Sequence, residues 1–72
     1  MNDVGTRKSI LLRLKQKLSH YEDILMILDQ LDAQLIVCLD PVKMREIRDS
    51  ISLLEARLAE TAKEIKELAL KL

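Results

Sequence analysis

Apolar residues in the second half of the chain recur at alternating steps of three and four. From Met44 the steps reach positions 47, 51, 54, 58, 61, 65, 68 and 72, and only position 61 is polar. This spacing, with charged residues between the apolar ones, is typical of a helix that packs along a coiled-coil seam. The pattern predicts a helix over about 41–71, with these seam residues: Met44, Ile47, Ile51, Leu54, Leu58, Ile65 and Leu68. For the polar position, Thr61, we expect a hydroxyl bonded to its own backbone.

The first half carries a broader apolar stripe. A heptad row is interrupted by Asp32, and a second row with Ile24, Leu31 and Cys38 lies beside it. A broad stripe can cover more than one neighbouring helix. The pattern predicts a helix over about 6–38 that follows a flexible N-terminus, 1–5. Its predicted seam residues are Leu11, Leu14, Leu18, Tyr21, Leu25, Leu28 and Leu35.

The only proline separates the two patterns. Asp40 suits a helix N-cap, and Pro41 suits the first helical position, where its missing N–H is not needed. A turn at Asp40 and Pro41 therefore predicts an all-α fold, an antiparallel two-helix hairpin within a single domain, 1–72. The alternative is one continuous, kinked rod that dimerises. In the hairpin, the acidic segment 22–32 comes near Arg48 and Arg57, and the basic segment 7–17 comes near Glu64 and Glu67.

Size and charge narrow the functional classes. A core in 72 residues rarely supplies more than about 3–5 kcal/mol without disulfides, metal or a partner, and the single cysteine excludes an internal disulfide. Twelve basic and twelve acidic residues balance, so neither nucleic acid nor an anionic membrane is favoured. Binding of nucleic acid through 7–17 is the weakest alternative. No apolar run approaches the ~20 residues of a membrane span, and basic residues interrupt the N-terminus, unlike a signal peptide. We expect a cytoplasmic protein.

Few side chains suggest chemistry. His20 lies outside the seam and is expected on the surface, and Cys38 is expected to behave as a small buried hydrophobe. The acidic pairs Asp29/Asp32 and Glu60/Glu64 are typical of solvated helix faces. No phosphate loop, triad or calcium loop is present. We therefore expect no enzymatic activity, no metal and no cofactor.

Apolar residues off the predicted seam favour binding to another protein. Tyr21 fits the core, with a partner anchor as the alternative. The off-seam residues form two low-charge strips that can seat a further helix. These predicted partner-binding residues are Met26, Ile27, Ile36, Leu53, Ala56 and Ala59.

The chain resembles the small cochaperones of bacterial type III secretion needle subunits, the YscE/EscE type. The resemblance spans most of 10–68 and includes "LDPVKM" at the connection and "REIRDSISLLEARLAETAKEI" in the closing helix. It implies a helical hairpin that pairs with a TPR-like chaperone and keeps the needle subunit soluble before export. The alternative from a different class is a homo-oligomerising coiled-coil module, for which a homodimer is the simplest form.

Overall fold

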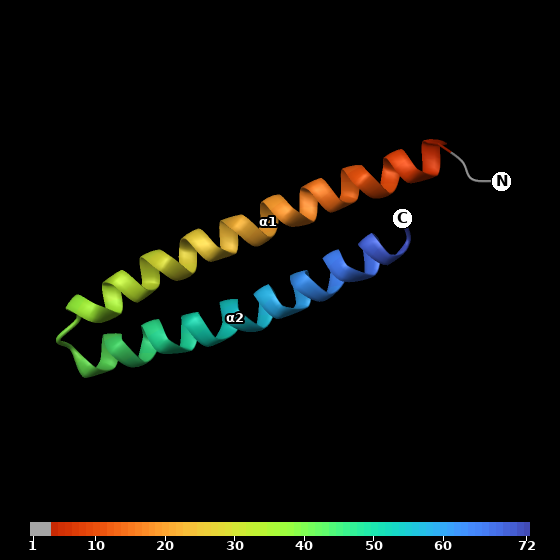
Figure 1. Ribbon diagram of the computed structural model, residues 1–72. Coiled ribbons are helices and arrows are strands. Elements are labelled where there is room, and N and C mark those ends of the chain that lie inside the picture. Colours follow the sequence, from red (N-terminus) through yellow and green to blue (C-terminus); the bar gives the residue numbers. More distant parts are fainter. Residues whose placement is uncertain (1–3) are drawn as a thin grey trace.

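The chain forms an antiparallel hairpin of two long helices (Figure 1). The structure is a computed structural model that describes residues 4–72. Helix α1 spans Val4–Val37 and helix α2 spans Pro41–Leu70, with residues 38–40 between them. The helices lie side by side over their length, which confirms the predicted all-α hairpin and excludes the continuous rod.

The helix bounds lie within two residues of the predicted ones, 6–38 and 41–71. At the N-terminus the difference matters, because α1 begins at Val4 and includes Gly5. Two residues of the predicted flexible segment 1–5 are therefore helical, and the remainder of that segment lies outside the described residues.

Asp40 and Pro41 form the turn, as the sequence predicts. Asp40 has an extended backbone (φ −89°, ψ 117°), and its Oδ1 accepts a hydrogen bond of 3.0 Å from the Val42 N–H. Its carbonyl oxygen accepts the bond of 2.9 Å from the Met44 N–H that starts α2. Pro41 then occupies the first turn, where a missing N–H leaves nothing unpaired.

The end of α1 needs no glycine. The Cys38 N–H donates to the Leu35 carbonyl at 3.3 Å, which tightens the last turn, and the Cys38 Sγ–H donates to the Asp40 carbonyl at 3.5 Å. No residue within 4–72 has a positive φ. The chain thus reverses through ordinary backbone conformations that any residue adopts.

The seam of α2 follows the predicted heptad. Its seven predicted residues, from Met44 to Leu68, are all half-buried or buried, and Thr61 between them is buried as well. In α1 the structure agrees with the prediction at Leu14, Tyr21, Leu28 and Leu35, which are all half-buried.

Three predicted seam residues of α1 need correction. Leu11, Leu18 and Leu25 are 49%, 48% and 43% exposed, so they flank the interface instead of filling it. A different row of residues takes their place in the seam. Its members are spaced at seven residues and are all half-buried or buried: Ile10, Lys17, Ile24, Leu31 and Cys38.

The one charged residue in each row explains why the row of Ile24, and not the row of Leu11, faces α2. The row of Leu11 contains Asp32, whose short side chain would leave a carboxylate in the seam. The row of Ile24 contains Lys17, whose longer stem covers apolar surface while its ammonium group reaches the edge. There it forms an ion pair with Glu64, and Asp32 stays exposed.

The hairpin has little interior. It measures 60 × 15 × 11 Å, and its radius of gyration is 16.9 Å, against about 11 Å for a compact chain of this length. Its accessible surface is 6000 Å², against about 4,600 Å² for a compact protein of this mass. Ile24 and Leu68 are the only large apolar residues within the described part of the chain that are less than a tenth exposed. Much apolar surface therefore remains outside the seam.

Candidate interaction surfaces

The residues considered for chemistry are dispersed. His20, Asp29, Asp32 and Glu60 are all exposed, and Cys38 is half-buried beside the turn. Among residues 4–72, no three side chains of His, Cys, Asp or Glu lie close enough together to hold one metal ion. The candidates that the tertiary structure offers are surfaces.

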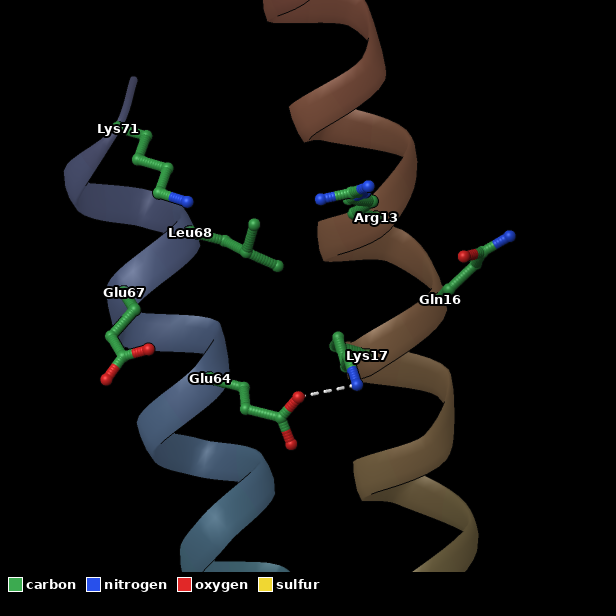
Figure 2. A pocket seen from close by; sticks show the side chains of 7 residues that line it. All are labelled: Arg13, Gln16, Lys17, Glu64, Glu67, Leu68 and Lys71. Atoms are coloured by element: carbon green, nitrogen blue, oxygen red, sulfur yellow. Dashed lines mark ion pairs between the residues drawn. The ribbon is translucent and has the colours of Figure 1, made fainter.

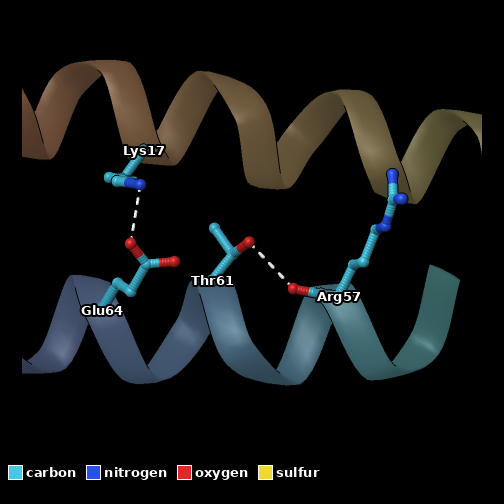
Figure 3. A network of polar contacts seen from close by, with 4 residues as sticks. All are labelled: Lys17, Arg57, Thr61 and Glu64. Carbon is cyan, nitrogen blue, oxygen red and sulfur yellow. Dashed lines mark hydrogen bonds and ion pairs between the residues drawn. The ribbon is translucent and has the colours of Figure 1, made fainter. Parts of the chain in front are cut away.

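A polar layer crosses the seam near the open end of the hairpin (Figure 3). Thr61 is only 4% exposed, and its Oγ1–H donates to the Arg57 carbonyl at 2.8 Å, which confirms the predicted backbone bond. Lys17 Nζ lies 2.7 Å from Glu64 Oε2, an ion pair between the predicted basic segment of α1 and Glu64. Because both charged side chains remain more than a third exposed, the pair contributes about 0–1 kcal/mol.

The same ion pair lies on a charged broad side of the hairpin (Figure 2). Basic and acidic side chains alternate around Leu68, which points between the helices toward α1. The shallow depression here is lined by Arg13, Gln16, Lys17, Glu64, Glu67, Leu68 and Lys71. Since the charges of both signs are mixed and exposed, we interpret this side as solvated surface.

The opposite broad side carries leucines on α1 and alanines on α2. Leu18 and Leu25 follow the seam residues Leu14 and Tyr21 by four residues, and Leu11 lies one heptad before Leu18, so all three flank the seam on the side away from Lys17. Ala62 and Ala69 have the same relation to the α2 seam and are exposed. We call these five residues the leucine–alanine face. Leu11 and Leu18 also line a shallow depression on α1, together with Leu14, Lys15, Ser19 and Glu22.

The closed end of the hairpin is the most exposed apolar region. Ile36, Val37, Leu39 and Val42 range from 66% exposed for Val42 to 94% for Leu39. We call these four residues the tip. Both helices terminate here, so no further turn of either helix shields the four side chains.

The sequence prediction named only Ile36 of the tip. The missed signal is the concentration of aliphatic residues in 36–42, on both sides of the capping aspartate and the proline. A heptad count passes over them, because the period is interrupted there.

Of the two predicted partner strips, the structure places the residues of only one next to each other. Leu53, Ala56 and Ala59 are exposed at three-residue steps along α2, so each lies next to the following one and together they form a strip that winds around the helix. Met26, Ile27 and Ile36 are exposed too, but they do not form one strip. Met26 and Ile27 are a hundred degrees apart around α1, and Ile36 lies more than two turns away at the tip.

Comparisons with protein-family models, with curated proteins and with solved structures find no match for this chain. In the described range 4–72, neither helix combines the length and the apolar character that crossing a bilayer requires.

Proposed function

We propose that this chain is a non-enzymatic helical adaptor that binds a second, helical protein. The tip is the observation that supports the proposal most strongly. Four aliphatic side chains on a loop and two helix ends are about two-thirds or more exposed, and no other part of residues 4–72 covers them. Exposed apolar clusters of this kind mark sites where another protein binds.

The resemblance noted above supplies the specific form of the proposal. In that form the chain is a cytoplasmic cochaperone of a type III secretion system, and its partner is a TPR-like chaperone. The two together would keep a needle subunit soluble before export. A needle-type subunit polymerises through amphipathic helices, and other helices can cover such surfaces by laying apolar side chains into a groove.

The proteins that neighbouring genes encode would provide a direct test. The specific proposal expects one of them to be a TPR-like protein and another to be a short helical subunit that polymerises. Co-expression of all three should give a stable complex with the subunit in the soluble fraction. Neighbouring genes of unrelated kinds, or a subunit that precipitates equally with and without this chain, would contradict the cochaperone.

Variants of the tip test the adaptor itself. We expect Leu39→Glu to weaken binding to the TPR-like partner by about tenfold or more, because a buried anchor at an interface contributes about 2 kcal/mol. Leu39 lies in the connection, so helix content should not change. Leu12→Glu is the matched control, because Leu12 is 59% exposed and lies far from the tip on α1. Equal affinity of both variants would remove the tip from the binding site.

The strip on α2 is tested separately. Leu53→Asp should keep the helix content and weaken partner binding, because Leu53 is 58% exposed on the outside of α2. Leu54→Asp places a charge in the seam and should unfold the hairpin. Circular dichroism distinguishes the two, and an equal loss of helix for both would contradict the seam of α2.

A further inference from the structure

We propose that two copies of this chain pack through their leucine–alanine faces and form an antiparallel four-helix bundle. The twofold axis of this dimer runs parallel to the helices. The proposal goes beyond the adaptor function, because it concerns a different surface and a different partner, a second copy of the chain.

The register of the hairpin places complementary residues at the same level. The Lys17–Glu64 ion pair fixes which residues of α1 and α2 lie across from each other. From that pairing, Leu18 lies across from Ala62, and one heptad further out Leu11 lies across from Ala69. A large side chain on one helix thus accompanies a small one on the other, on the same side of the hairpin.

A twofold axis along the helices turns this arrangement into a fit between copies. The rotation places α1 of one copy against α2 of the other, and the open ends of both hairpins lie at the same end of the bundle. Leu18 then faces Ala62 of the second copy, and Leu11 faces Ala69. Large side chains opposite small ones allow ridges to enter grooves, the packing of four-helix bundles.

Charges at the closed half of the same side favour the same axis. Asp32 lies one heptad after Leu25 in the same row of α1, and Arg48 lies across from it on α2. In the dimer, Asp32 of each copy therefore faces Arg48 of the other copy. Both side chains are exposed, and neither has an ion-pair partner within residues 4–72. An axis perpendicular to the helices would instead place Leu18 over Asp32 and would lose both Asp32–Arg48 pairs, whereas the parallel axis keeps these pairs and places Leu25 opposite Glu55.

The chain as a whole exposes enough surface for an interface of this kind. The chain exposes about 1,400 Å² more than a compact protein of its mass would. A standard stable interface takes about 800 Å² from each partner. The net charge of zero also means that two copies do not repel each other overall. The tip and the Leu53 strip stay outside this interface, so the dimer can still bind a different protein.

Sedimentation equilibrium of the full chain tests the dimer. We expect twice the chain mass of 8.3 kDa for the wild type. Leu18→Glu and Ala62→Glu, one on each helix, should sediment as monomers with unchanged helix content. Leu12→Glu, on the outside of α1, should remain a dimer. A wild-type monomer at every concentration tested would overturn the proposal, and so would equal dissociation by Leu12→Glu and Ala62→Glu.

A charge exchange tests the direction of the axis. Asp32→Arg and Arg48→Asp should each raise the dissociation constant of the dimer severalfold, because each places like charges opposite one another. The double variant should restore wild-type affinity. A dimer that neither single variant affects would overturn the axis parallel to the helices. Binding of the TPR-like partner through the tip does not enter either measurement, so the adaptor function can fail independently.

Discussion

Replacing Ile24 and Leu25 one at a time distinguishes the seam of the structure from the seam that the heptad pattern alone predicts. Ile24 is 3% exposed and Leu25 is 43% exposed, although they are adjacent and both aliphatic. Ile24→Ala removes three carbons from the buried interface. At about 0.8 kcal/mol for each buried methylene, plus a cavity, the loss is about 3 kcal/mol. The better helix propensity of alanine returns about 0.4 kcal/mol.

Leu25→Ala removes as many carbons from a side chain that is only about half covered. Water fills the vacated space at this edge, so no cavity term arises, and the expected loss is about 1 kcal/mol. The difference between the variants is about 1.5 kcal/mol, or about 8 °C in melting temperature for a domain of this size. Since a small core supplies about 3–5 kcal/mol in total, Ile24→Ala should leave the hairpin barely stable.

The assay is thermal and urea unfolding followed by far-ultraviolet circular dichroism. Because Leu25 also belongs to the leucine–alanine face, both variants should be measured at a protein concentration where sedimentation shows monomers. Equal destabilisation, or a larger loss for Leu25→Ala, would refute the register described above.

Three further substitutions test single contacts. Thr61→Val should change the free energy of unfolding by less than about 0.5 kcal/mol, because a buried methyl group offsets one lost hydrogen bond; a loss above ~2 kcal/mol in urea unfolding would contradict this. Lys17→Met should raise the free energy of unfolding by about 0.5–1 kcal/mol, since a half-exposed ion pair with Glu64 contributes little and a methionine buries more apolar surface in the seam; a variant less stable than the wild type at high salt would contradict this. Asp40→Ala should lower the melting temperature by an amount equivalent to about 1 kcal/mol, while Asp40→Asn, which can still cap Val42, should not.

Much of the architecture was predictable because it depends on short-range physics. The heptad from Met44 to Leu68 needs only the helical period to indicate a buried stripe. Asp40 and Pro41 act through capping and a fixed φ, which are local effects, and they placed the turn correctly. The contact between the basic segment 7–17 and Glu64 was predictable once the two helices were taken as antiparallel, and Lys17 makes it.

The candidate surfaces were less predictable. The strip of Leu53, Ala56 and Ala59 lies outside the seam, as expected from its place in the heptad. The tip was mostly missed, because apolar residues at a helix break are exposed only when no further element covers them. That depends on the whole chain and not on residues 36–42.

The sequence by itself determined two amphipathic helices, their approximate ends and the reversal between them. The tertiary structure alone decided which of two equally apolar rows in α1 faces α2. The helical period cannot distinguish these two rows, because they lie on either side of the same seam residues, such as Leu14 and Leu28. The row that faces α2 is the one whose charged side chain can still reach water. The long side chain of Lys17 reaches the edge of the seam beside Glu64, and the short side chain of Asp32 could not. Because the row of Ile24 faces α2, Leu11, Leu18 and Leu25 lie on the surface.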